Sequence, residues 1–416
     1  MTKNIAALRK EFPMLEASFN GRRMVYLDSA CTVLKLKSAA DEQRRHMLEL
    51  GGCGGKRSSH ALAAAMEENF YAARGRVAAF MGAGSPEEII FTSGVTDAAN
   101  LLANSFPFTA ARDEVILSPV EHNAVFLPFE RLAAAGRIKL RVAPLAGFRT
   151  DLEALRKMIS RRTALVCLAH ASNIFGGSED IAAAAELAHR AGACLFSDDA
   201  QYAPTHGGSG APLGADACAF SGHKLGAPYC TGALYVKREL LARLRPWRVG
   251  GGTIEDVSFS GGRYKVKYLG NYQGFEAGVQ NASGAAALAV TLERLKKCGF
   301  AEIRAHVSGL VSAALKELDG VKGVKVLGRR EDLLQGSLIS LFPEKKNFSV
   351  PDFNLFLNQG LKGRFVAVRT GRHCADLACL ASGYRETIRI SFFAYNTEED
   401  AACFTQALKK YLSLLK

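Results

Sequence analysis

Between residues 88 and 236 the chain alternates short apolar runs with stretches in which apolar residues recur at helical spacing. The helical stretches are TDAANLLANSF, PFERLAAAG, LEALRKMIS and IAAAAELAHRAG. The apolar runs predict strands, and they are EIIFTS (88–93), EVILSP (114–119), KLRVAPL (139–145), ALVCLAH (164–170), CLFSDD (194–199), ACAFSG (217–222) and GALYVK (232–237). This alternation predicts an α/β fold in which a mostly parallel seven-stranded sheet is flanked by helices.

The pattern changes after about residue 285, where the long helical stretch SGAAALAVTLERLKKCG leads into mixed helices and strands that continue to residue 416. We interpret residues 26–290 as a large domain and residues 291–416 as a smaller α+β domain. Residues 1–25 are expected to pack on the small domain.

Composition and charge exclude several classes of protein. The 416 residues are 48% hydrophobic and 22% charged, and no apolar stretch approaches the roughly 18 residues of a membrane span. The net charge of +13 is spread in short groups without a basic helix, which argues against nucleic-acid binding and favours anionic ligands or acidic partners. The ten cysteines lack CxxC spacing, so we expect reduced thiols, no metal site and a cytoplasmic protein.

A glycine turn follows the first predicted strand. Gly94, Val95 and Thr96 open the helix that follows EIIF, and Thr92 and Ser93 place hydroxyl groups beside it. Free backbone N–H groups at the start of a helix bind anions, so this turn is a candidate phosphate site. A capped helix start without a ligand would give the same pattern.

Polar side chains also follow the other predicted strands, whose carboxyl ends should converge on one crevice. They are His122, Asn173, Asp198, Gln201, Ser221, His223 and Lys224. Pyridoxal 5'-phosphate needs a lysine that bonds its aldehyde carbon, a carboxylate that keeps its ring nitrogen protonated, and a flat side chain that stacks on the ring. Lys224, Asp198 and His122 fit these roles, and the sequence therefore predicts this cofactor.

A cysteine near the C-terminus is a candidate nucleophile. The segment VRTGRHCADLA (368–378) places Arg369 and His373 beside Cys374, and Arg389 follows in the strand-like TIRIS. Positive surroundings favour the thiolate, which is the nucleophilic form of cysteine. The guanidinium of Arg389 is suited to bidentate capture of an amino-acid carboxylate.

With these motifs the sequence resembles the class V, fold-type I pyridoxal-phosphate enzymes, and within them the group II (Suf-type) cysteine desulfurases and selenocysteine lyases. SGHK is shared across the class, whereas RTGxHCA carries the sulfur-accepting cysteine of the desulfurases. The matching segments are YLDSA (26–30), FTSGVTDAANLLANS, Glu121-His122, HASN (170–173), DDAQ (198–201), FSGHK (220–224), GGGT (250–253), FEAG (275–278), and RTGRHCA with RISFFAYNT (369–397).

The resemblance implies a homodimer that converts L-cysteine to L-alanine and leaves a persulfide on Cys374 for a sulfur-acceptor protein, as in iron–sulfur cluster assembly. It implies that His122 stacks on the ring and assists proton transfers. The other implied roles are Gln201 at the phenolic oxygen, Thr96, Ser221 and His223 at the phosphate, Asn173, Arg369 and Arg389 at the substrate carboxylate, and His60 at the entrance.

Several residues depart from the family pattern, among them Arg372, which stands where the family often has a second histidine. Val279 and Val95 stand where the family has hydroxyl residues near the phosphate, and Cys31 replaces an alanine on the substrate side. Two alternatives stay open. The first is another enzyme of the class, either a selenocysteine or C–S lyase or a class V aminotransferase, in which Cys374 is incidental. The second is a non-catalytic persulfide carrier, which would bind no cofactor and would therefore be colourless. L-Selenocysteine also stays open as a substrate of the desulfurase.

Overall fold

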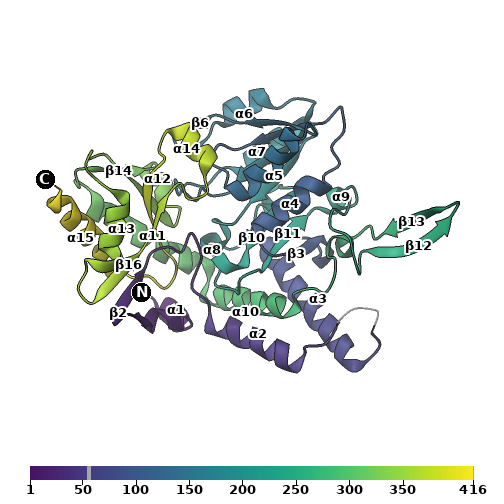
Figure 1. Cartoon of the computed structure of the whole chain (residues 1–416), viewed down its shortest axis with the longest axis horizontal. Coiled ribbons are helices and arrows are strands. Elements are labelled where there is room, and N and C mark those ends of the chain that lie inside the picture. Colours follow the sequence, from purple (N-terminus) through teal and green to yellow (C-terminus); the bar gives the residue numbers. More distant parts are fainter. Residues whose placement is uncertain (54–57, 416) are drawn as a thin grey trace.

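The computed structural model describes residues 1–53 and 58–415, and its largest sheet has seven strands in the order β3-β11-β10-β9-β8-β4-β5 (Figure 1). They are β3 (Ile89–Thr92), β4 (Glu114–Leu117), β5 (Lys139–Val142), β8 (Thr163–Ala169), β9 (Cys194–Asp198), β10 (Ala217–Ser221) and β11 (Gly232–Val236). Among these strands β11 is antiparallel to both of its neighbours, and the other pairs are parallel. The predicted α/β class and the mostly parallel seven-stranded sheet are confirmed.

The inner strands of this sheet are buried on both faces, which explains why they are continuous apolar runs, whereas the edge strand β5 is mostly exposed. Successive side chains of a strand point to opposite faces. Along β10, Cys218 and Phe220 belong to one apolar core, and Ala217 and Ala219 belong to another. The helices of this region are α2 (Lys37–Glu49), α3 (Ala61–Met81), α4 (Val95–Ser105), α5 (Asn123–Ala134), α6 (Leu152–Met158), α7 (Ile181–Arg190), α8 (Ala203–His206), α9 (Arg238–Leu241) and α10 (Ala282–Cys298).

Helix α5 begins at Asn123, whereas the sequence pattern placed helical spacing only from Pro128 onward. Nδ1 of His122 accepts a hydrogen bond from the N–H of Ala124 at 3.0 Å and thereby caps the helix. The helix continues past Pro128, whose side chain is buried. Periodicity missed this first part of α5 because its start depends on a histidine cap.

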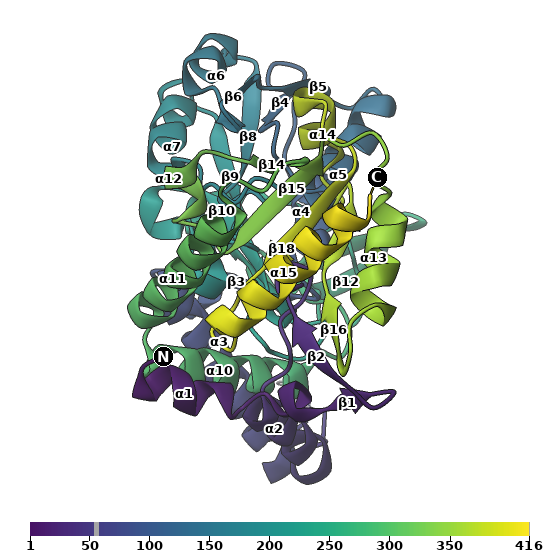
Figure 2. The ribbon, with the colours of Figure 1, turned by 90° about the vertical axis from the view of Figure 1, so that its left-hand side faces the viewer.

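The C-terminal part contains an antiparallel four-stranded sheet in the order β14-β15-β18-β17. Its strands are β14 (Val324–Leu327), β15 (Leu338–Pro343), β17 (Arg369–Gly371) and β18 (Thr387–Ser391), and its helices are α11 (Phe300–Leu318), α12 (Arg330–Leu333), α13 (Val350–Gln359), α14 (Asp376–Ser382) and α15 (Glu398–Leu414). Figure 2 shows α11 and α15 side by side across this sheet. The domain boundaries given above stay a prediction.

The N-terminal segment is tied to the C-terminal part by strand pairing. It contains α1 (Lys3–Arg9), β1 (Ser18–Phe19) and β2 (Arg22–Tyr26), and β2 pairs in parallel with β16 (Arg364–Ala367). Parallel strands end on the same side. The turn at residues 28–32 therefore lies close to Arg369, which begins β17.

Two hairpins complete the strands. One pairs β6 (Leu145–Ala146) with β7 (Arg149–Thr150), and the other pairs β12 (Ile254–Ser260) with β13 (Arg263–Tyr268). The second hairpin projects from the body of the molecule, and every one of its strand residues is exposed (Figure 1).

Candidate active site

A cavity of about 160 Å³ lies between the carboxyl ends of the central strands and the loop that joins β17 to α14. Most of the predicted site residues line it, namely Val95, Thr96, His122, Asn173, Asp198, Ser221, His223, Lys224, Arg369, Cys374 and Arg389. Its wall also contains Ala30, Cys31, Ala124, Ala200 and His373. Residues far apart in the sequence thus face one space, as expected for the carboxyl edge of a parallel sheet.

Three predicted residues lie outside the wall of this cavity. Gly94 is the residue before α4. Nε2 of Gln201 donates to the carbonyl oxygen of Ala30 at 2.8 Å, and this bond holds the Ala30 backbone against the cavity. His60 is exposed and caps α3 by accepting a hydrogen bond from a backbone N–H at 3.0 Å.

Lys224 and Asp198 come from neighbouring parallel strands. Asp198 ends β9, and Lys224 stands in the short turn after β10. Burial lowers the pKa of Lys224, which the charge of Asp198 partly offsets. Burial raises the pKa of Asp198 to about 6, and Lys224 opposes that shift. At neutral pH the carboxylate is therefore ionised and can pair with a cationic ring nitrogen.

His122 presents a neutral imidazole to the cavity. Burial, followed by the charges of Lys224 and Arg389, lowers its pKa to about 3. Because Nδ1 accepts from the backbone of α5, the proton of the neutral ring lies on Nε2. The ring is thus flat, uncharged and oriented, which suits stacking on an aromatic ligand.

The glycine turn forms a cradle at the start of α4. Gly94 has φ of 137°, and the N–H of Val95 donates to Oγ of Ser221 at 2.9 Å. A Cβ atom on Gly94 would lie 2.9 Å from this same oxygen, so only glycine fits the turn. The side chain of Val95 is buried in the apolar core, and this residue contributes to the turn through its backbone.

The loop that carries Cys374 is fixed at several points. His373 and Cys374 have φ of 57° and 54°, a left-handed conformation that non-glycine residues rarely adopt. The carbonyl of His373 accepts from Nδ2 of Asn173 at 2.8 Å, and the carbonyl of Cys374 accepts from the N–H of Asn123 at 2.7 Å. The exposed thiol is therefore held on a strained, preorganised turn.

The sequence interpretation of charge around Cys374 was wrong in one respect. His373 is buried and shares a 2.6 Å hydrogen bond between its Nε2 and Oγ1 of Thr387. Burial lowers its pKa to about 2, so this histidine adds no positive charge. Arg372 pairs with Asp376 at 3.2 Å. The positive charges in the wall itself come from Arg369, Arg389 and Lys224 instead.

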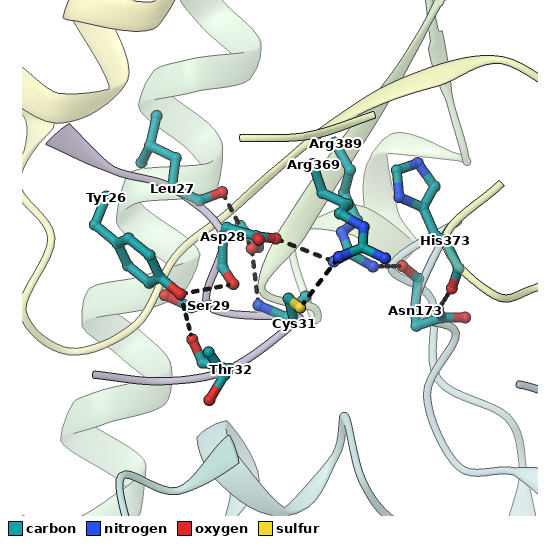
Figure 3. A network of polar contacts seen from close by, with 12 residues as sticks. Tyr26, Leu27, Asp28, Ser29, Cys31, Thr32, Asn173, Arg369, His373 and Arg389 are labelled. Atoms are coloured by element: carbon teal, nitrogen blue, oxygen red, sulfur yellow. Dashed lines mark hydrogen bonds and ion pairs between the residues drawn. The ribbon is translucent and has the colours of Figure 1, made fainter. Parts of the chain in front are cut away.

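Arg389 and Asn173 line the cavity, and each has a polar atom without a partner among the described residues. Nη1 of the buried Arg389 donates to the carbonyl of Asn173 at 2.8 Å (Figure 3). Nε of Arg389 and Oδ1 of Asn173 are buried without a hydrogen-bond partner among the described residues. Such atoms are rare in folded proteins and indicate a place for a polar ligand.

Asp28 is a site residue that sequence reasoning missed. Its Oδ1 accepts from Nη2 of Arg389 at 3.3 Å, and Nη1 of Arg369 donates to Sγ of Cys31 at 3.5 Å (Figure 3). The sequence did contain a signal for Asp28, which stands in the motif YLDSA two residues after the end of β2. This network joins the turn after β2 to β17 and β18.

The residues present fit pyridoxal 5'-phosphate. Lys224 can bond its aldehyde carbon, Asp198 can pair with its ring nitrogen, and His122 can stack on its ring. At the cradle formed by Ser221 and the start of α4, a Cβ on Gly94 would clash, and the N–H groups that open the helix could bind the phosphate. All of these groups line one cavity except Gly94, which shapes the turn behind it.

No cluster of potential metal ligands occurs within residues 1–53 and 58–415. Across the same ranges, every helix is too short or too polar to cross a membrane.

Comparison with known proteins places the chain among enzymes of sulfur metabolism. The family model for aminotransferase class-V matches residues 25–404. A probable cysteine desulfurase from Vibrio cholerae is 35% identical over 420 residues and covers 100% of both chains. A cysteine desulfurase from Escherichia coli is 33% identical over 418 residues, again with 100% of both chains covered.

Solved structures of cysteine desulfurases have the same fold as this chain. The apo cysteine desulfurase from Thermococcus onnurineus has a TM-score of 0.88 at 28% identity, and the match covers 99% of this chain and 98% of that one. The cysteine desulfurase CsdA from Escherichia coli, in an S-sulfonic acid form, has a TM-score of 0.87 at 30% identity over 100% of both chains. The chain therefore belongs to the aminotransferase class-V family, and to its cysteine desulfurase branch.

Proposed function

We propose that this chain is a pyridoxal-phosphate-dependent cysteine desulfurase in which Cys374 accepts the sulfur of L-cysteine and L-alanine is released. One observation carries the proposal. Lys224, at the end of a buried strand, and Cys374, on a preorganised turn, face the same cavity of about 160 Å³. The family and its named relatives support the reaction class.

The cofactor would be held by groups on three elements. Asp198 would pair with its ring nitrogen, Ser221 and the N–H groups that open α4 would bind its phosphate, and Lys224 would bond its aldehyde carbon. When bound, the cofactor supplies an electron sink that weakens bonds around the α-carbon of an amino acid. The protein contributes the orientation of that sink.

The substrate carboxylate would lie between Arg389 and Asn173. Nε of Arg389 lacks an acceptor among the described residues, and Nδ2 of Asn173 is an amide donor that bonds the carbonyl of His373. Arg389 is buried, so its attraction for a carboxylate is weakly screened by water. This contact would orient the side-chain sulfur of cysteine toward the loop of Cys374.

The sulfur step would use Cys374 as the nucleophile. Its thiolate attacks the sulfur of the bound cysteine, the carbon–sulfur bond breaks, and its electron pair stays with the substrate carbon. A proton then completes alanine. Lys224 is suited to carry such protons at Nζ, because burial lowers its pKa below the ordinary value of a lysine.

A homodimer is part of this proposal. The hairpin of β12 and β13 exposes a group of large apolar side chains, namely Ile254, Val257, Phe259, Tyr264, Val266 and Tyr268. Val279 is 86% exposed although it follows the motif FEAG. Patches of this kind on a projecting arm favour contact with a second copy of the chain.

The remaining parts of the proposal concern delivery. We infer a cytoplasmic enzyme that passes persulfide sulfur to an acceptor protein, as in iron–sulfur cluster assembly. The net charge of +13 favours an acceptor with an acidic surface.

The test uses purified holoenzyme and its Cys374→Ala variant. We expect a yellow protein whose alanine release from L-cysteine, measured with reductant, collapses in the variant. Cys230→Ala is the matched control, because Cys230 is also exposed and also has positive φ, of 57°, but lies outside the cavity. Unchanged alanine release in Cys374→Ala would contradict the proposal and favour a lyase or an aminotransferase. Colourless protein without activity would favour a persulfide carrier.

A further inference from the structure

Two thiols face the proposed reaction space. All ten cysteines lie in the described ranges, and Cys31 and Cys374 are the two that line the cavity. Cys374 reaches it from the loop after β17, and Cys31 from the turn after β2. Lys224 lines this cavity as well, so both thiols share it with the proposed reacting lysine.

Cys31 is held in place by its backbone and by its sulfur. Its N–H donates to the carbonyl of Asp28 at 3.0 Å, which closes a tight turn. Its Sγ accepts from Nη1 of Arg369 at 3.5 Å, a normal length for a hydrogen bond to sulfur (Figure 3). This contact fixes the position of the sulfur at the cavity wall.

The cavity that these thiols share is built to receive a polar ligand. Arg389 and Asn173 are 3% and 5% exposed, and each contributes a buried polar atom that lacks a partner within the described residues. Arg389 and Asn173 line the same cavity as Cys31 and Cys374, so an amino acid bound there would share the cavity with both thiols. Cys31 therefore stands in a binding site rather than on an ordinary surface.

We propose that Cys31 is a second sulfur-accepting thiol, which takes the sulfane sulfur from Cys374 and stores it. This inference rests on the proposed persulfide at Cys374. The persulfide extends the reach of Cys374 into the cavity by one S–S bond of about 2.05 Å. The cavity that the extended side chain enters has a volume of only about 160 Å³, and Cys31 lines it too.

The transfer balances without an added oxidant or reductant. The thiolate of Cys31 attacks the terminal sulfur of the Cys374 persulfide, and a new S–S bond forms at Cys31. The S–S bond at Cys374 breaks, and Cys374 leaves as a thiolate. The proton on the terminal sulfur stays with it, and the sulfane sulfur keeps its oxidation state.

The consequence is a capacity for two sulfur atoms in each active site. Once Cys374 is again a thiolate, it can accept sulfur from a second cysteine while Cys31 holds the first. Without reductant or acceptor, the wild type should release about two equivalents of alanine per site before it stops, because each thiol stores one sulfur. Cys31→Ser should release about one, since it keeps an acceptor for Arg369 but lacks the nucleophilic sulfur.

The experiment measures this alanine burst and locates persulfides by mass spectrometry of alkylated peptides, for wild type, Cys31→Ser, Cys374→Ala and the control Cys230→Ser. We expect a gain of about 32 mass units, one sulfur atom, on each of Cys31 and Cys374 in the wild type. Cys230→Ser should match the wild type, and Cys374→Ala should leave Cys31 unmodified.

Several results would overturn the inference while leaving the proposed function intact. One is a wild-type burst of one equivalent with persulfide on Cys374 alone. Others are a second sulfur added to Cys374 itself, or a disulfide between Cys31 and Cys374 with release of sulfide. A complete lack of persulfide on Cys374, with alanine still formed, would instead contradict the proposed function.

A second measurement is independent of turnover. A short bifunctional alkylating reagent should bridge Cys31 and Cys374 in the resting holoenzyme and should leave Cys230 singly modified. If both thiols react separately and no bridge forms, the two sulfur atoms are too far apart for the transfer.

Discussion

Arg389 of β18 lies directly opposite Arg369 of β17 in an antiparallel strand pair. Like charges in this position destabilise a sheet unless other groups compensate them. Asp28 pairs with Arg389, whereas Arg369 is exposed and reaches Cys31. The pair therefore leaves positive charge on the cavity wall, which an anionic substrate would neutralise.

Replacing Arg389 tests whether this residue binds the carboxylate of the substrate. Arg389→Lys keeps the positive charge but loses the planar guanidinium that can donate two hydrogen bonds to a carboxylate. We expect kcat/KM for L-cysteine to fall about 10- to 100-fold, because hydrogen bonds to a charged group contribute about 1.5–3 kcal/mol. Steady-state kinetics should show the loss mainly in KM. Arg372→Lys is the control, because Arg372 lies outside the cavity and pairs with Asp376. An equal loss in both variants would contradict carboxylate capture by Arg389.

Asp198→Asn should separate stability from activity. The pKa of Asp198 is raised to about 6 in the folded chain, above the ordinary value of 3.8. Ionising this buried carboxyl disfavours folding, so wild-type stability should decline as the pH rises from about 4 to about 6. Asparagine does not ionise, and it can still accept from the N–H of Ala200 as Asp198 does at 2.9 Å.

The measurement for Asp198→Asn is thermal unfolding of the cofactor-free proteins between pH 4 and pH 8. The Tm of the variant should equal that of the wild type near pH 4 and exceed it at pH 7. The activity of the variant should fall roughly 30-fold or more, as expected when one partner of a buried charge pair worth about 2–5 kcal/mol is removed. A Tm difference that does not change with pH would show that the shift in the pKa of Asp198 is not linked to folding.

Gly94→Ala should weaken cofactor retention. The new Cβ would meet Oγ of Ser221 at 2.9 Å and disturb the cradle at the start of α4. Gly136→Ala is the control, because Gly136 also has positive φ, of 69°, but a Cβ atom added there would meet no other atom within 4 Å. Both variants should lose about 1–3 kcal/mol of stability from backbone strain. Absorbance of the bound cofactor after dialysis should fall only in Gly94→Ala. An equal fall in both variants would show that the turn at Gly94 has no specific role in holding the cofactor.

Thr387→Val tests how the thiol is positioned. The 2.6 Å hydrogen bond between Thr387 and His373 holds the turn that carries Cys374. Losing a net contribution of about 0.5–1.5 kcal/mol should lower kcat about 2- to 10-fold with KM unchanged. The rate at which Cys374 is alkylated in the resting enzyme should change as well.

The control for this variant is Thr405→Val. Thr405 is also buried, but its hydroxyl bonds to a carbonyl within α15, away from the cavity. If Thr405→Val changed kcat and alkylation of Cys374 as much as Thr387→Val, the effect would reflect general stability rather than the position of the thiol.

The sequence by itself determined the elements and most of the site. Apolar runs with helical stretches between them predicted all seven strands of the central sheet, because strands that are buried on both faces, as all but the edge strand β5 largely are, require continuous apolar residues. The residues that follow those strands were then expected to converge, and Lys224, Asp198 and His122 do line one cavity. Arg389 was expected on a strand and lies in β18.

Tertiary structure decided what local patterns do not encode, which is distance and burial. It brought Cys31 to Arg369 through the parallel pairing of β2 with β16, two segments more than 300 residues apart. It buried His373 and removed the charge that its position beside Cys374 had suggested. Sequence spacing fixes which side chain a strand presents, whereas the charge of that side chain and its neighbours depends on how the strands pack.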